Sequence, residues 1–150
     1  MSDYAVQLRE KRQWTTRRLI DALRPRMGEG WTLLDVGGGV GAIQHELLAA
    51  GAARALQVDA SPAYLEASRE EAQRRGHADR VEHRYGDFTD LADGVPEADI
   101  VTLDRVICCY PDMERLVTAS AGKARHVYGL VFPRERWLTR AFLAAGNLFM

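Results

Sequence analysis

The sequence predicts a single α/β domain in which a parallel sheet carries helices on both faces. Three observations lead to this prediction. Short apolar segments alternate with amphipathic ones, acidic residues follow several of the apolar segments, and the first apolar segment leads directly into a glycine-rich turn. Strands that alternate with helices form parallel sheets with right-handed crossovers. A hydrophobic content of 47% in 150 residues is enough to build one core.

The amino-terminal region is predicted to be helical before the first strand begins. Charged residues mixed with apolar side chains at helical spacing indicate two short helices within residues 3–24. Thr15 or Thr16 is a suitable cap for the second of them. Proline and glycine end this region, and the first strand is expected at residues 31–36.

The next elements follow from cap and stop signals. A helix is expected at residues 42–50, because Gly51 is a typical helix stop. A second strand is expected at residues 55–58. The pair Ser61-Pro62 then combines a helix cap with a proline in the first turn, and the helix that it opens is expected to end near Arg75.

The second half of the chain repeats the alternation. Strands are expected at residues 81–85, 98–103 and 126–132, and a helix at 111–121 separates the last two. A terminal helix is expected at residues 133–150. The region 1–28 is interpreted as a helical lid and the region 31–132 as the core of one domain.

The glycine-rich turn and the three acidic residues that follow the later strands are expected to share one edge of the sheet. Asp35 stands just before the glycines of residues 37–41, and Asp59, Asp87 and Asp104 follow the next three strands. Ligands of open parallel sheets bind beyond the carboxyl ends of the strands, beside the first strand. Glycine allows backbone N–H groups to approach such a ligand closely. The pattern therefore predicts a nucleotide-like ligand.

Two classes of nucleotide ligand compete for this turn. Residues 37–42 also satisfy the G-x-G-x-x-A dinucleotide pattern, with Asp59 near the place of a ribose-binding acid. However, the carboxylate of Asp35 would face a pyrophosphate unfavourably, whereas it suits a ligand that carries an ammonium and a sulfonium. Residues 86–88 offer an acceptor for an exocyclic amine and an aromatic face for a purine.

Together these motifs resemble those of the class I S-adenosylmethionine-dependent methyltransferases, and of their small-molecule branch in particular. The resemblance covers about residues 30–132 and rests on a D-x-G-x-G-x-G loop, two strand-end acids and a Gly-Asp-Phe turn: Asp35, Gly37, Gly39, Gly41, Asp59, Gly86, Asp87, Phe88 and Asp104. It implies a Rossmann-like doubly wound sheet in the strand order 3-2-1-4-5. It also implies S-adenosyl-L-methionine as cofactor and methyl transfer to a small molecule as the reaction.

The resemblance assigns cofactor-binding roles by position. Asp35 would hold the methionine ammonium, Asp59 the ribose hydroxyls and Asp87 the adenine amine, while Phe88 packs against the purine. The full set of expected cofactor-binding residues is Asp35, Gly37, Gly38, Gly39, Gly41, Asp59, Ala60, Asp87, Phe88, Asp104 and Arg105. Asp104 and Tyr110 are candidates for catalytic contact with the acceptor. No metal site is expected, because the two cysteines are adjacent in sequence and the histidines are scattered.

Each of the acidic positions also has a structural interpretation. Asp59 could belong to the turn before Ser61, Asp87 could be a plain turn residue, and Asp104 could form a local ion pair with Arg105. Of the adjacent cysteines, Cys108 and Cys109, one is interpreted as packed in the core, and neither is assigned a chemical role. His45, His77 and His83 are interpreted as surface residues.

Composition limits the choice of partners. The net charge of -1 leaves no footprint for a polyanion, so a nucleic-acid partner is not expected. The absence of a signal peptide and of a membrane-length apolar run favours a cytoplasmic protein without stable membrane insertion. The family usually adds two further strands after the fifth, so the chain is interpreted as truncated. An exposed fifth strand or the terminal helix could support a homodimer.

Two other functions stay open at this point. One is a NAD(P)-binding oxidoreductase, which the dinucleotide pattern favours and Asp35 opposes. The other is a non-catalytic or fragmentary S-adenosylmethionine-binding module, which the early end of the chain favours.

Overall fold

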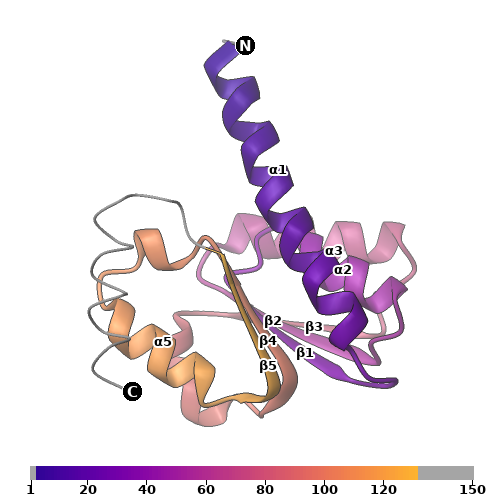
Figure 1. The fold of residues 1–150 in the computed structure, drawn as a ribbon. Helices are drawn as coiled ribbons and strands as arrows, with labels where there is room; N and C mark the ends of the chain where they lie inside the picture. Colours follow the sequence, from indigo (N-terminus) through magenta and orange to yellow (C-terminus); the bar gives the residue numbers. More distant parts are fainter. Residues whose placement is uncertain (1–2, 132–150) are drawn as a thin grey trace.

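A five-stranded parallel sheet forms the centre of the computed structural model, which describes residues 3–131 (Figure 1). The strand order is β3-β2-β1-β4-β5 and all four pairings are parallel. The strands are β1 (Thr32–Val36), β2 (Arg54–Asp59), β3 (Val81–Tyr85), β4 (Ala98–Asp104) and β5 (Ala124–Val131). The predicted fold class and strand order are confirmed.

Helices cover both faces of this sheet, as Figure 1 shows. They are α1 (Asp3–Leu23), α2 (Ala42–Ala49), α3 (Pro62–Arg74), α4 (Phe88–Leu91) and α5 (Met113–Ala121), with 3-10 turns η1 (Arg24–Arg26), η2 (Ala92–Gly94) and η3 (Ile107–Cys109). One core layer joins the sheet to α1, α2 and α3 through side chains such as Ile20, Leu47 and Ala72. The other joins it to α4 and α5 through side chains such as Phe88 and Leu116.

Side-chain caps begin three of these helices. Ser61 accepts a hydrogen bond from the Tyr64 amide at 3.3 Å, with Pro62 in the first turn, as the sequence indicates. Asp112 caps α5 and Asp87 caps α4 in the same way. Such caps satisfy backbone N–H groups that have no partner within the helix.

The amino-terminal region differs from the prediction. It is one helix of 21 residues rather than two short ones, because neither Thr15 nor Thr16 interrupts the helical backbone. The carboxyl-terminal part of α1 packs on the sheet through Ile20 and Leu23, while its other end extends beyond the domain (Figure 1).

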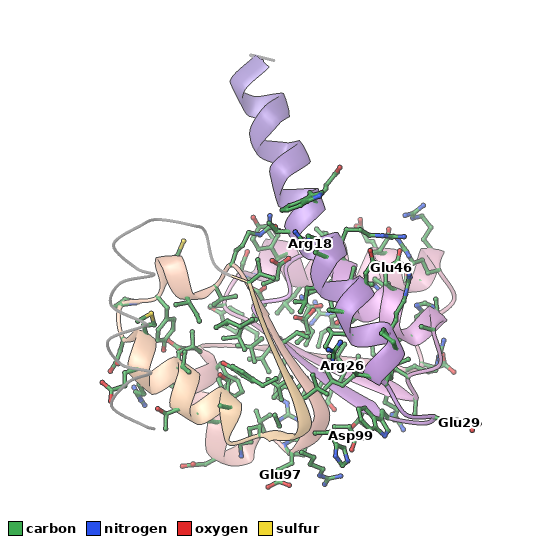
Figure 2. The ribbon with its side chains drawn as sticks, in the orientation of Figure 1. Arg18, Arg26, Glu29, Glu46, Glu97 and Asp99 are labelled. Atoms are coloured by element: carbon green, nitrogen blue, oxygen red, sulfur yellow. The ribbon has the colours of Figure 1, made fainter. Side chains whose placement is uncertain are left out.

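Charged contacts tie α1 to the neighbouring helices. Glu46 of α2 lies beside α1 (Figure 2) and accepts a hydrogen bond from Arg24 Nη2 at 2.5 Å. Arg17 of α1 and Arg75, which follows α3, reach the same carboxylate at 3.9 Å. Where β1 begins, the Thr32 amide donates a hydrogen bond to Asp99 at 2.9 Å, and this contact joins β4 to β1.

Three histidines do not lie where the sequence placed them. His45 is completely buried and His77 nearly so, and their Nδ1 atoms are 3.1 Å apart. His83 is partly buried and its Nε2 lies 3.0 Å from Ser68 Oγ. The prediction of surface positions was wrong because His45 of α2 packs against His77, which follows α3, and because His83 of β3 packs against Ser68 of α3.

Two further predictions concern the last third of the chain. Cys109 is exposed, and the prediction that one of the two cysteines packs in the core stays a prediction. The helix expected at residues 133–150 lies outside the described residues, as does any dimer contact that it would make. Among the described strands, β5 pairs only with β4, and no described helix is long and apolar enough to cross a membrane.

Candidate functional site at the carboxyl edge of the sheet

The glycine loop after β1 adopts a backbone that other residues rarely adopt. Gly37, Gly39 and Gly41 have φ values of +65°, +59° and +85°. These left-handed angles strain residues that carry a Cβ atom. The space above Gly39 is open, since a Cβ there would meet nothing within 4 Å. The loop therefore exposes its backbone where a ligand can reach it.

Asp59 ties the glycine loop to the end of β2. Its Oδ2 accepts a hydrogen bond from the Gly39 amide at 3.0 Å, and its Oδ1 accepts one from the Ser61 amide at 2.8 Å. The turn contact that was offered as the structural interpretation is therefore present. The hydrogen bond from the Gly39 amide orients the carboxylate toward the loop. Asp59 also lines the cavity described below.

Asp35 lies beneath the glycine loop and is entirely buried. Its Oδ1 accepts a hydrogen bond from Thr102 Oγ1 at 2.9 Å, while its Oδ2 has no partner among the described residues. A Cβ on Gly38 would lie 2.4 Å from that oxygen, so a larger residue at this position would force the Asp35 side chain or the loop to move. Burial raises the pKa of Asp35 to about 7, with Asp104 and Asp59 adding repulsion and the Thr102 hydrogen bond opposing it.

Asp87 gathers three hydrogen bonds on one oxygen. Its Oδ1 accepts from the Thr89 amide at 2.9 Å, from Thr89 Oγ1 at 3.0 Å and from the Tyr110 hydroxyl at 2.7 Å. Burial alone would raise the pKa of Asp87, but the hydrogen bonds from Tyr110 and Thr89 outweigh burial and hold this pKa below its usual range. The carboxylate is therefore ionised at neutral pH.

A cavity of about 150 Å³ lies between the glycine loop, the ends of β2 and β3 and the segment after β4. It is lined mainly by apolar groups with two carboxylates among them: Val36, Gly37, Val58, Asp59, Ala60, Gly86, Asp87, Phe88, Val106, Tyr110 and Leu116. Pockets for whole drug-sized ligands measure roughly 300–1,000 Å³. The cavity therefore suits one part of a nucleotide-like ligand, such as a purine, with the remainder along the open loop.

Asp104 and Arg105 lie at the end of β4 but do not line the cavity. Arg105 Nε lies 3.2 Å from Asp104 Oδ1, and Asp104 Oδ2 accepts a hydrogen bond from Thr16 of α1 at 2.6 Å. The ion pair named as the structural interpretation is present. Arg105 has a φ of +60°, a backbone angle that is uncommon outside glycine. These contacts bring α1 to the edge of the sheet where the glycine loop lies.

A buried polar network supports the glycine loop from below. Gln57 of β2 is fully buried and its Nε2 donates to the Gly39 carbonyl at 2.6 Å. Its Oε1 accepts from Gln44 Nε2 at 3.0 Å and from Ser68 Oγ at 2.5 Å. Gln57 therefore connects the loop to both α2 and α3.

The structure brings together part of the predicted site. Gly37, Asp59, Ala60, Asp87, Phe88 and Tyr110 line one cavity. Six others do not line it, namely Asp35, Gly38, Gly39, Gly41, Asp104 and Arg105. Val36 and Val58 were missed, although their places at strand ends next to the predicted acids could have identified them. Val106 and Leu116 carry no such signal in the sequence. The described residues contain no cluster of three or more potential metal ligands.

The comparison with protein families gives one match. Residues 34–124 match the family described as "Methyltransferase domain". This range begins in β1 and ends at the start of β5, so it contains the glycine loop, the residues that line the cavity, and the four acids Asp35, Asp59, Asp87 and Asp104.

A relative with a curated name is also a methyltransferase. Over 54 residues the chain is 44% identical to the ribosomal protein L11 methyltransferase of Enterobacter sp. (strain 638); the match covers 36% of this chain and 18% of that protein. The chain therefore spans only a small part of this relative.

Two solved structures share the fold. The O-methyltransferase TomG from Streptomyces achromogenes, in complex with SAM, aligns with a TM-score of 0.60 and 20% identity over 73% of this chain and 50% of that chain. A SAM-dependent methyltransferase from Thiobacillus denitrificans, in complex with S-adenosyl-L-homocysteine, aligns with a TM-score of 0.57 and 19% identity over 72% and 44%. At these identities the likeness concerns the fold.

Proposed function

The chain belongs to the class I S-adenosylmethionine-dependent methyltransferase family, and from this premise we propose that it binds S-adenosyl-L-methionine and transfers its methyl group to a small molecule. The observation that carries the proposal is the cavity between the glycine loop and the ends of β2 and β3. It unites two ionisable acids with an apolar wall at the carboxyl edge of the sheet, which is where parallel sheets bind nucleotides.

The residues present fit this cofactor on three counts. The open space above Gly39 leaves room for a ligand against the loop backbone. The carboxylates of Asp59 and Asp87 offer acceptors to ribose hydroxyls and to an exocyclic amine. The apolar side chains of Phe88 and Leu116 offer a purine an apolar surface to pack against.

Asp35 is assigned to the methionine end of the cofactor. Its Oδ2 has no hydrogen-bond partner among the described residues and lies just below Gly38. A buried carboxylate without a full set of partners is stabilised by a nearby positive charge. Asp35 does not line the cavity. Its carboxylate would therefore attract the ammonium of the cofactor through the loop or through a bridging water.

The cofactor supplies a sulfonium methyl group that a nucleophile attacks in line. Alignment of two reactants is the main requirement for such a transfer, and a base is needed only where the nucleophile carries a proton. Asp104 stays the candidate for contact with the acceptor, because it lies at the end of β4 beside the loop. Tyr110 is better placed for another role, because its hydroxyl is bound to Asp87.

A protein acceptor is the second candidate. It is favoured by the 44% identity over 54 residues to a ribosomal protein L11 methyltransferase. The small-molecule proposal is supported by the sequence resemblance, and the net charge of -1 gives no support to a polyanionic acceptor. Incubation with S-adenosylmethionine labelled in its methyl group distinguishes the two. We expect label in the low-molecular-mass fraction of a cell extract, and label in protein would favour the alternative.

Cofactor binding is tested by calorimetric titration with S-adenosylhomocysteine. We expect binding that Asp59→Ala weakens at least about tenfold, since a hydrogen bond to a charged group contributes roughly 1.5–3 kcal/mol. The matched control is Asp93→Ala, which removes an exposed carboxylate in η2, away from the cavity lining. NADH should not bind. A folded wild-type chain that ignores S-adenosylhomocysteine, or that prefers NADH, would overturn the proposal.

A further inference from the structure

The phenol of Tyr110 belongs to the purine end of the cavity. Its hydroxyl lies 2.7 Å from Asp87 Oδ1 and 2.6 Å from Thr89 Oγ1, and the ring lines the same cavity as Phe88. Tyr110 stands in the segment between β4 and α5, whereas Asp87 and Thr89 stand at the start of α4. The phenol therefore joins two segments that both contribute to the lining of the cavity.

The two carboxylate oxygens of Asp87 differ in the hydrogen bonds that they accept. The three donors that the structure shows for Asp87 all reach Oδ1. Among the described residues none donates to Oδ2. A carboxylate held by one oxygen presents the other as an acceptor in a fixed direction, and an ionised carboxylate can only accept.

The three side-chain oxygens form a closed triangle. Tyr110 and Thr89 together supply two hydroxyl protons, so two of the three contacts in the triangle can carry a proton at one time. Whichever pair does so, Asp87 Oδ1 receives at least one hydroxyl proton beside the Thr89 amide, and it receives two when both hydroxyls donate to it. Among the residues that the structure describes, removal of the phenol leaves Thr89 as the one neighbour that donates to Asp87.

We propose that Tyr110 is a positioning residue that makes this site selective for adenine over a 6-oxo purine, by fixing the direction of the Asp87 carboxylate. This inference rests on the proposed function. The exocyclic amine of adenine is a donor, whereas a 6-oxo purine carries an acceptor at the same position. An acceptor that faces the carboxylate would leave two buried acceptors without protons, which is costly.

The test compares S-adenosylhomocysteine with S-inosylhomocysteine, whose purine carries a carbonyl in place of the amine. Calorimetry measures the affinity of both ligands for the wild type and for Tyr110→Phe. We expect the wild type to prefer the adenine ligand. Loss of one hydrogen bond on Asp87 should weaken the adenine ligand about fivefold and change the affinity for the inosine ligand by less than about twofold, so that selectivity falls.

Two further variants keep the test sharp. Tyr128→Phe is the matched control, because its hydroxyl is bound to a side chain, Ser120 Oγ at 2.8 Å, but the residue does not line the cavity; it should leave selectivity unchanged. Asp87→Asn can keep an oxygen as the cap acceptor and present an amide N–H₂ to the purine. We expect it to shift preference toward the inosine ligand.

The outcomes separate this inference from the proposed function. If the wild type binds neither ligand, the proposed function fails. If the wild type binds S-adenosylhomocysteine but Tyr110→Phe weakens both ligands equally, Tyr110 is a packing residue and the inference is overturned. A wild type without preference between the two purines would overturn it as well.

Discussion

Replacing Asp35 by asparagine should remove a large pH dependence from the stability of the protein. Asp35 is fully buried beneath the glycine loop and holds one side-chain hydrogen bond, from Thr102. Burial raises its pKa from 3.8 to about 7. Asparagine has nearly the same shape and keeps an oxygen to accept from Thr102, but it does not ionise.

The sign follows from proton linkage. The folded pKa lies above the unfolded one, so the contribution of Asp35 is fully present below about pH 3.8 and is lost as the pH rises through about 7. Each pKa unit corresponds to about 1.4 kcal/mol. The whole difference is therefore roughly 4 kcal/mol, of which roughly 3 kcal/mol falls between pH 5 and pH 8.

The assay is urea unfolding of the wild type and Asp35→Asn at pH 5, 6, 7 and 8. The free energy of unfolding of the variant minus that of the wild type should increase by roughly 3 kcal/mol over this range. Other titrating groups cancel, because both proteins contain them. A difference that stays constant with pH would refute the reasoning, because Asp35 would then be ionised in the folded protein throughout.

Three further changes test other parts of the structure. Gln57→Leu removes the side chain that donates to the Gly39 carbonyl and leaves buried polar groups unpaired, so urea unfolding should show a loss of about 1–3 kcal/mol; an unchanged midpoint would contradict the network. His45 is buried and its pKa is lowered to about 4, so stability should fall as the pH drops from 6.5 toward 4, and thermal melts of His45→Phe should show a smaller fall than the wild type. Ser61→Ala removes the cap on the Tyr64 amide and should cost about 1 kcal/mol, with no change in ligand affinity; a neutral result would show that the cap is dispensable.

Much of the fold could be predicted from local signals. The strand at residues 81–85 and the helix that Ser61 caps were predicted with the bounds that the structure has, or within one residue of them. Apolar runs closed by glycine or acid indicate buried parallel strands without any knowledge of the partner strand. The helix α1 was divided in error, since a threonine can cap a helix or lie within one; in the structure Thr16 lies within α1, and its hydroxyl donates to Asp104.

The site was predicted less completely, because its chemistry depends on contacts between distant segments. The order of motifs placed Asp59 and Asp87 at one edge of the sheet, and both line the cavity. No local pattern indicates that Tyr110, 23 residues further on, donates to Asp87. In the same way, the pairing of His45 with His77 depends on how α2 packs beside α3. Such polar pairs form only when the chain has already folded.

The central claim is that the cofactor lies against the glycine loop and the ends of β2 and β3. The most direct test is to follow backbone amide resonances by NMR while S-adenosylhomocysteine is added. We expect the largest shifts at the loop of residues 37–41, at Asp59 and Ala60, and at residues 86–88, with little change at the opposite edge around Asp99. Shifts that concentrate at that opposite edge, or no shifts in a folded protein, would contradict the account.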